Sequence, residues 1–270
     1  MIKNSKNKKI SLLLIHRLFL VFLCLVALIP FVVLIQLAFT DDQNKLTLGN
    51  FPKVTETFNV LLAFGNSALI TIGAVFLLII CASLAGYSIS RFKIITNKLI
   101  YYTFLFCMMI PAVINSVPLY KVMLAIGGIN SLWAMMLLLA ANSMPFATFL
   151  IAGYMSNIPV DLEESATIDG ATPIQIFLRI ILPMLKPVFM SIIIIQGIGI
   201  WNNYAQAVFY LQDQSVQTIP LAMQLFFQQY GAQWHIMASA TILAMIPALL
   251  TFIFGQKYFM SGLNSGAVKG

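Results

Sequence analysis

Residues 163–187, which read EESATIDGATPIQIFLRIILPMLKP, form a polar segment between two long apolar runs. The whole chain has only eight acidic residues. Four of them lie within nine positions of this segment and its start: Asp161, Glu163, Glu164 and Asp169. This crowding of carboxylates in a very apolar chain indicates that the segment lies in different surroundings from its neighbours.

The segment is predicted to form two short helices around a glycine turn. Pro159 suits a first turn, and the acids after it lie where the helix macrodipole favours negative charge. Gly170 is expected to end this helix. Thr172-Pro173-Ile174-Gln175 has the pattern of a capping box, which predicts a second helix from there to Pro183. We expect one face of that helix to carry Ile174, Phe177, Leu178 and Ile181, with Gln175 and Arg179 opposite.

Composition places the chain in a membrane. It is 60% hydrophobic and 9% charged, which is more apolar surface than a soluble domain of 270 residues could bury. An apolar window of about 20 residues spans the hydrocarbon core as a helix. Six windows fit this length, and they make one transmembrane domain over 1–270: 12–39, 63–89, 99–120, 129–155, 187–208 and 236–256.

Basic residues predict the orientation of these windows. They gather in alternate connections, and only Lys45, Lys53 and Lys121 fall on the other side. By the positive-inside rule, both termini, the 90–98 loop and the 156–186 loop are cytoplasmic. The residues on the cytoplasmic side are Lys3, Lys6, Lys8, Lys9, Arg17, Arg91, Lys93, Lys98, Arg179, Lys186, Lys257 and Lys269.

The first apolar run is interpreted as a retained membrane helix, since it is too long for a signal-peptide core and no A-x-A site follows it. Cys24, Cys81 and Cys107 lie inside predicted spans without C-x-x-C spacing, so we expect no disulfide and no metal site.

Two connections are expected on the external side. Residues 40–62 are polar and rich in turn formers. Residues 209–235 are rich in glutamine, and Leu221, Leu225 and Phe226 fit a short amphipathic helix at the outer face. Two interpretations stay open for that helix: a surface element packed on the bundle, or a docking surface for an external partner.

The cytosolic segment on its own could be a cap of the bundle, but its motif points further. Glu164-Ser165-Ala166, Gly170, and Ile180-Ile181-Leu182-Pro183 resemble the EAA loop of membrane subunits of binding-protein-dependent ABC importers, E-A-A-x3-G-x9-I-x-L-P. Every spacing matches, and the one departure is Ser165, where the family usually has alanine.

The likeness to carbohydrate importer permeases of the MalG type covers essentially the whole chain. It includes Ile168-Asp169-Gly170-Ala171, Trp201-Asn202-Asn203-Tyr204, and the ending from Gln256 to Gly270. Asn203 departs from the family, which commonly has an acid there. The resemblance implies an all-α integral membrane permease with six transmembrane helices, both termini cytoplasmic, and a cytosolic coupling-helix loop at 156–186.

The resemblance also implies that energy comes from a partner. The chain has no G-x-x-x-x-G-K-[ST] sequence, and all eight acids fall in predicted loops, so neither an ATPase site nor a buried carboxylate relay is expected. ATP and magnesium are expected on two copies of a cytosolic ATPase. A second homologous permease and an external solute-binding protein complete the expected assembly, in a bacterial or archaeal cell membrane.

The resemblance assigns ATPase coupling to one group of residues, with Glu164 meeting basic groups, Ala166 allowing close approach and Gly170 making the turn. Arg179 is expected in an intrachain ion pair, and the tail 262–270 at the ATPase. The coupling group is Glu164, Ser165, Ala166, Asp169, Gly170, Ile180, Leu182 and Pro183.

Amide and aromatic side chains are the candidates for a sugar path, since sugars present hydroxyls and apolar ring faces. Each could instead bond a neighbouring helix. The candidates are Gln196, Trp201, Asn202, Asn203, Tyr204, Asn66, Asn115 and Asn142.

Three alternatives remain beside the carbohydrate importer. The same pattern could serve a polyol or a glycerol phosphodiester. Gly65-Asn66-Ser67 with His235 resembles the G-x-S of an intramembrane serine protease, although a catalytic pair needs hydrogen-bond contact. A channel or receptor would leave the cytosolic motif without a role.

Overall fold

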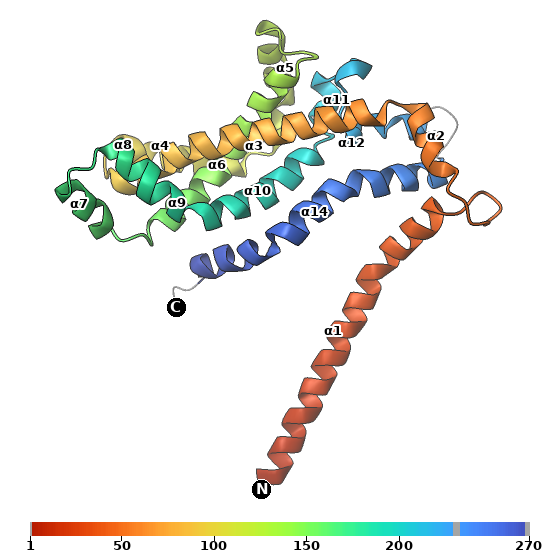
Figure 1. The fold of residues 1–270 in the computed structure, drawn as a ribbon, viewed down its shortest axis with the longest axis horizontal. Coiled ribbons are helices and arrows are strands. Elements are labelled where there is room, and N and C mark those ends of the chain that lie inside the picture. Colours follow the sequence, from red (N-terminus) through yellow and green to blue (C-terminus); the bar gives the residue numbers. More distant parts are fainter. Residues whose placement is uncertain (1, 229–232, 268–270) are drawn as a thin grey trace. The chain divides into compact units, whose positions relative to one another are not determined.

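The computed structural model describes residues 2–228 and 233–267, and these residues form helices without a named strand. Two regions are compact: a first unit of residues 1–58 with 225–243, and a second of residues 59–224 with 244–270. The helices, shown in Figure 1, are α1 (Ile2–Ala38), α2 (Asn50–Thr57), α3 (Val60–Arg91), α4 (Ile95–Met109), α5 (Ser116–Ala125), α6 (Leu132–Met155), α7 (Asp161–Ile168), α8 (Pro173–Ile176), α9 (Leu182–Met184), α10 (Lys186–Trp201), α11 (Ala207–Tyr210), α12 (Ile219–Ala222), α13 (Leu225–Gln228) and α14 (Trp234–Ala267).

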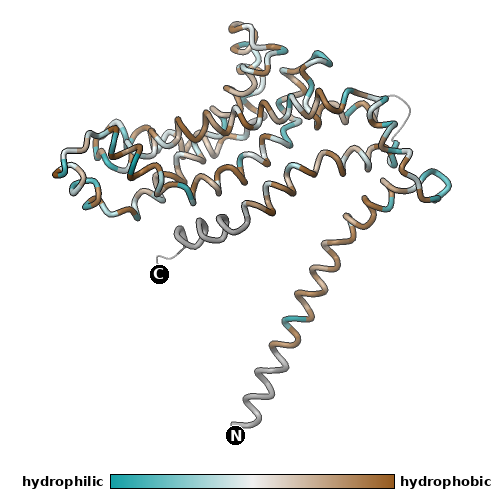
Figure 2. Tube along the Cα trace, in the orientation of Figure 1, coloured by the Kyte–Doolittle hydropathy of each residue, from teal (hydrophilic) through white to brown (hydrophobic). Residues whose placement is uncertain are grey.

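Several helices are long and apolar enough to cross a membrane. Among the residues that the structure describes, four helices pass on length and composition: Leu13–Ala38, Val60–Arg91, Leu132–Met155 and Trp234–Gly255. The helical run Pro173–Met184 continues into α10 after a bend of 64°, so the two together form one further broken candidate. Figure 2 shows mostly hydrophobic residues along the coloured parts of α1 and α14. The chain is therefore a multi-pass membrane protein.

The window 99–120 is not one helix, which corrects the sequence prediction. Helix α4 ends at Met109, and α5 begins only at Ser116, after a 3₁₀ turn over Ala112–Asn115. Pro111 explains the break because it disfavours the helical conformation in the residue before it, and Ile110 is indeed extended, with φ −85° and ψ 121°. The helix in the window 187–208 is also shorter than predicted: α10 ends at Trp201, and Asn202 is no longer helical.

The first unit is held together by polar contacts at the end of α1. The Asn50 side chain donates to the carbonyl oxygens of Ala38 and Thr40, at 3.0 and 2.8 Å. Ser239 donates to the same Ala38 oxygen. Phe58 and Phe226 pack edge to face, with ring centres 6.0 Å apart. These contacts fix the polar connection between α1 and α2 against the start of α14.

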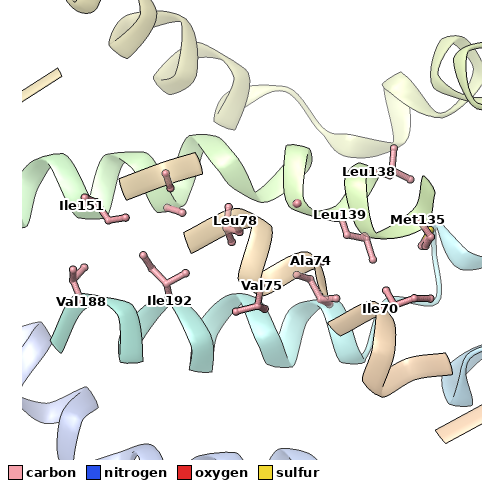
Figure 3. Close-up of a cluster of buried hydrophobic side chains, with 14 of the residues drawn as sticks. Ile70, Ala74, Val75, Leu78, Met135, Leu138, Leu139, Ile151, Val188 and Ile192 are labelled. Atoms are coloured by element: carbon pink, nitrogen blue, oxygen red, sulfur yellow. The ribbon is translucent and has the colours of Figure 1, made fainter. Parts of the chain in front are cut away.

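The second unit is built around α3, which packs between α6 and α10. Figure 3 shows Ile70, Ala74, Val75 and Leu78 of α3 facing side chains of both neighbours. At Gly86 the two helices α3 and α6 come so close that a Cβ would lie 2.6 Å from Cγ2 of Ile151. Figure 1 shows α7 and α8 at one end of this unit, and α11 and α12 at the other end.

The close approach at Gly86 predicts a specific cost of adding one methyl group. Gly86→Ala should lower stability by about 1–3 kcal/mol, because Ile151 and the backbone of Ala152 leave no space for it. Gly153→Ala is the matched control on α6, since nothing lies within 4 Å of its Cβ position. Thermal unfolding of the purified protein in detergent measures both, and equal midpoints would show that the helices do not pack this closely.

Candidate functional site

Helix α7 and the turn after it follow the sequence prediction, except that Pro159 precedes the helix instead of lying in its first turn. Asp161, Glu163 and Glu164 lie in the first turn of α7, where they favour the helix electrostatically. The helix ends at Ile168, and Gly170 has φ +82°, a conformation that side chains with a Cβ rarely adopt. The amide of Ala171 then donates to the oxygen of Ala166 at 2.9 Å and closes the turn. The role of Gly170 as the stop is confirmed.

The second helix of the segment starts with the predicted capping box. The Gln175 amide donates to Thr172 Oγ1 at 3.4 Å, and Gln175 Oε1 accepts from the Thr172 amide at 2.8 Å. Pro173 occupies the first turn, where its missing donor is not needed.

The buried face of this second helix differs from the predicted one. Ile174 and Leu178 are exposed, at 71% and 52%, whereas Ile176 and Ile181 are buried. Residues Phe177–Ile181 form a π turn, in which hydrogen bonds join residues five apart. The π turn brings Ile176 and Ile181 to one side. The prediction from a regular helical period is confirmed for Ile181 and for Phe177, which packs against the core, and was wrong for Ile174 and Leu178.

An ion pair that the sequence analysis did not identify fixes α7 to the end of α3. Arg91 Nε lies 2.5 Å from Glu163 Oε1, and both side chains are almost fully buried, at 9% and 12% exposed. Tyr87 donates to the other Glu163 oxygen at 2.9 Å. The remaining guanidinium nitrogens of Arg91 donate to the carbonyl oxygens of Met155 and Ile158, at 3.2 and 3.0 Å.

Arg91 therefore joins α3, the end of α6 and α7 at one point. No local sequence pattern indicates this ion pair, because Arg91 and Glu163 lie 72 residues apart in the sequence. By itself, Arg91 is one more basic residue of the 90–98 loop. Arg179, for which an intrachain ion pair was expected, is exposed and makes none among the residues that the structure describes.

The predicted coupling residues are mostly on the surface of this segment. Glu164, Ser165, Asp169, Gly170 and Pro183 are exposed, and Ala166, Ile180 and Leu182 are half-buried. Ser165 donates to its own helix, at the oxygen of Asp161. Ile168 and Ile174 flank the Gly170 turn and are 87% and 71% exposed. Two carboxylates and two large apolar side chains are thus presented together around one rigid turn.

The path candidates after α10 are partly engaged in local bonds. Trp201 is buried, and its Nε1 donates to the oxygen of Ala244 at 3.1 Å. Asn202 is exposed and donates back to Ile198. Asn203 Oδ1 accepts from the amide of Gln206 and so shapes the turn. Tyr204 is exposed at 39%, and Gln196 is half-buried.

The asparagines of the other helices separate into two kinds. Asn66 is buried, and its Nδ2 donates to the oxygens of Ser215 and Gln217, both at 3.0 Å. Its amide is therefore committed to holding the segment before α12. Asn115 and Asn142 are exposed, the first beside α5 and the second on α6.

The segment 210–219 is held by Asn66 and Ser67 on α3 and by Asn130 just before α6. Asn130 Oδ1 accepts from the amides of Gln212 and Asp213, at 2.6 and 3.0 Å, and Ser67 Oγ accepts from the amide of Ile219 at 2.9 Å. Tyr210, the first residue of the segment, is buried, and this burial raises the pKa of its hydroxyl. The helix predicted around Leu221, Leu225 and Phe226 is two helices, α12 and α13, with Leu221 and Phe226 buried.

Ser67 has the contacts of a structural residue. It is 2% exposed, and its oxygen bonds a backbone amide. His235 contacts the carbonyl oxygen of Leu37 through Nδ1 at 2.9 Å and lies 3.7 Å from Asp42 through Nε2. Neither arrangement is that of an activated nucleophile and its base. Within the described ranges no group of three His, Cys, Asp or Glu residues could hold a metal ion.

A pocket of about 350 Å³ lies between α3, α10 and α14. Its wall is almost entirely apolar and includes Val75, Ile193 and Trp201. The hydroxyl of Thr71 has no hydrogen-bond partner there, and that of Thr251 donates to its own helix. Of the path candidates only Trp201 lines this pocket, so it lacks the amides that a sugar site needs.

Comparison with known proteins gives consistent similarities. Residues 78–264 match the family described as binding-protein-dependent transport system inner membrane component. The melibiose/raffinose/stachyose import permease protein MelC of Bacillus subtilis is 39% identical over 226 residues, which cover 83% of this chain and 82% of MelC. The arabinooligosaccharides permease protein AraQ of Halalkalibacterium halodurans is 32% identical, covering 85% and 82% of the two chains.

A solved structure has the same fold at low sequence identity. A chain of a bacterial ABC transporter that imports the acidic polysaccharide alginate superposes with a TM-score of 0.79 and 17% identity, over 91% of this chain and 95% of that one.

The contrast between Glu163 and Glu164 can be tested directly. Glu163→Gln should destabilise the protein by about 3 kcal/mol, because it leaves the buried Arg91 guanidinium without its counter-ion. Glu164→Gln is the matched control, one residue away and exposed, and should cost at most about 0.3–1 kcal/mol through its lost interaction with the start of α7. Thermal unfolding compares them, and equal effects would contradict the assignment of the ion pair.

Asn66→Ala should loosen the segment 215–219. Loss of two hydrogen bonds at about 1 kcal/mol each predicts roughly 30-fold faster amide exchange there. The amide of Ile219, which donates to Ser67 next to Asn66, should exchange faster as well. Asn142→Ala, an exposed residue on α6, serves as the control. Hydrogen–deuterium exchange with mass spectrometry measures both, and unchanged protection in the first variant would show that Asn66 does not hold the segment.

Proposed function

The chain belongs to the family of binding-protein-dependent transport system inner membrane components and has no ATPase site of its own, and we propose that it is a permease subunit of a carbohydrate importer. The observation that carries the proposal is the exposed turn at Gly170, with Glu164 and Asp169 beside it, fixed to a transmembrane helix by Arg91. A rigid surface joined to a span is what transmission of movement requires.

Docking of a cytosolic ATPase is the role that we infer for this turn. Ile168 and Ile174 are exposed in a segment that the positive-inside rule places in the cytosol, and exposed apolar residues ringed by polar ones are typical of protein contacts. Glu164 and Asp169 would meet basic groups of the ATPase. The small residues Ser165, Ala166 and Gly170 would allow the ATPase to approach closely. Ile180, Leu182 and Pro183 would fix the direction in which the chain enters α10.

Energy for transport would come from ATP and magnesium bound to two copies of that ATPase. Closure of the ATPase pair would push on α7, and the Arg91–Glu163 pair would pass the movement to α3. Since α3 packs on both α6 and α10, the three helices would move together between inward-open and outward-open states.

Carbohydrate is the substrate class that the relatives favour. The names of MelC and AraQ specify oligosaccharides, and a maltodextrin permease protein, MdxG of Bacillus subtilis, is 28% identical over 94% of this chain. None of these three names specifies a polyol or a glycerol phosphodiester. Asn66 is excluded as a sugar contact, because its side-chain amide already donates to the backbone oxygens of Ser215 and Gln217. Asn202, Asn203 and Tyr204 remain as candidates for sugar contacts.

The assembly that we propose has a second permease and an external solute-binding protein. The topology that we propose has six spans, the third of them broken between α4 and α5, and both termini in the cytosol. One such chain would form half of a path, so a homologous partner would supply the other half. The segment 210–219, held by Asn66, Asn130 and Ser67, would be the surface for the binding protein. A bacterial or archaeal cell membrane is the expected location.

Coupling is tested with the purified complex in lipid, by measuring ATP hydrolysis with and without binding protein loaded with candidate oligosaccharides. Wild type should be stimulated several-fold, and Glu164→Lys and Gly170→Asp should lose most of the stimulation while still inserting. Glu56→Lys reverses the charge of an exposed acid outside the turn and should behave as wild type. If no ATPase co-purifies, or if the turn variants remain stimulated, the turn is only a structural cap.

A further inference from the structure

A second pocket lies at the junction of α3 and α4, and none of the residues that line it belongs to the Gly170 turn. It has a volume of about 540 Å³, and its lining includes Ile89, Phe92, Lys93, Ile94 and Lys98. The junction is held in place by Asn97, which is buried and donates to the carbonyl oxygens of Ser88 and Phe92, at 2.8 and 2.9 Å. The pocket is therefore formed by the fold of the junction itself.

The two lysines of this α3–α4 pocket lack an acidic partner. The sequence has no Asp or Glu between Glu56 and Asp161, and Glu163 is already bound by Arg91 and Tyr87. Neither Lys93 nor Lys98 forms an ion pair within the described part of the chain; Lys98 Nζ lies 6.0 Å from the ring centre of Tyr102. Two positive charges at one pocket favour an anionic ligand.

Apolar side chains surround the same two charges. Phe92, Ile94 and Ile95 are 53%, 56% and 80% exposed, within four residues of chain at the end of a membrane-spanning helix. A small soluble anion would neutralise the lysines but leave these side chains in contact with water. A ligand with an anionic head and apolar chains satisfies both requirements.

We propose that the α3–α4 pocket binds the headgroup of an anionic phospholipid. The lysines contact the phosphate, and the exposed Phe92, Ile94 and Ile95 lie against its acyl chains. The cytosolic leaflet as the source rests on the orientation given under the proposed function, because basic pockets at the cytosolic ends of helices attract anionic lipids. The pocket is not part of the ATPase-docking turn, and its occupancy needs no nucleotide.

The test measures lipid retained by the purified complex in detergent, without nucleotide. Delipidated complex is incubated with phosphatidylglycerol or with phosphatidylcholine of the same chains, and bound lipid is counted by native mass spectrometry. Each interfacial lysine contributes about fivefold to binding of an anionic surface, so the double variant Lys93→Gln/Lys98→Gln should retain phosphatidylglycerol roughly 25-fold more weakly. Lys45→Gln/Lys53→Gln, with the same loss of charge, should retain it as wild type does.

Three results would overturn the proposal. These are equal retention of the two lipids by wild type, an equal loss in the Lys45/Lys53 control, or displacement of the lipid by inorganic phosphate at constant ionic strength. Lys93→Arg/Lys98→Arg keeps both charges and should keep the preference. The binding-protein stimulation of ATP hydrolysis is measured on the same preparation, so a failure of lipid binding is separated from a failure of the importer function.

Discussion

The buried ion pair between Arg91 and Glu163 is the interaction on which the α7 end of the second unit depends. A guanidinium out of water needs its donors occupied, and here a carboxylate and two carbonyl oxygens bind it. The partners are Glu163 on α7, Met155 at the end of α6 and Ile158 in the connection between these two helices. The position of α7 relative to α3 and α6 is thereby fixed, and the Gly170 turn inherits that position.

The opposite end of the same unit uses neutral hydrogen bonds for a similar purpose. Asn66, Ser67 and Asn130 bind backbone groups of the segment 212–219, which has little regular structure to satisfy its own amides and carbonyls. Helix α3 supplies a residue to both ends, Asn66 near its start and Arg91 at its last position. A movement imposed at one end of α3 is therefore carried to the other by a continuous helix.

Local patterns were read correctly from the sequence wherever neighbouring residues alone decide the conformation. The capping box at Thr172, the stop at Gly170 and the acidic first turn of α7 are all determined within a few residues. The π turn after Ile176 was not predictable in this way, because no pattern of neighbouring residues indicates that Ile176 and Ile181, five positions apart, are both buried. The Arg91–Glu163 pair and the commitment of Asn66 join residues far apart in sequence, and no local pattern encodes them. The break at Ile110 was readable from Pro111, but mean hydropathy over a long window conceals a single proline.

The two adjacent glutamates also limit how this permease could be recombined with others. A chimaera that transplants residues 156–186 alone would carry Glu163 without Arg91 and Tyr87, and so would place a carboxylate against a surface not built to receive it. The transferable piece is discontinuous: the loop together with the last turns of α3. The side chain of Glu164, in contrast, is exposed and forms no ion pair with the described residues. Its identity can therefore vary with the protein that it contacts.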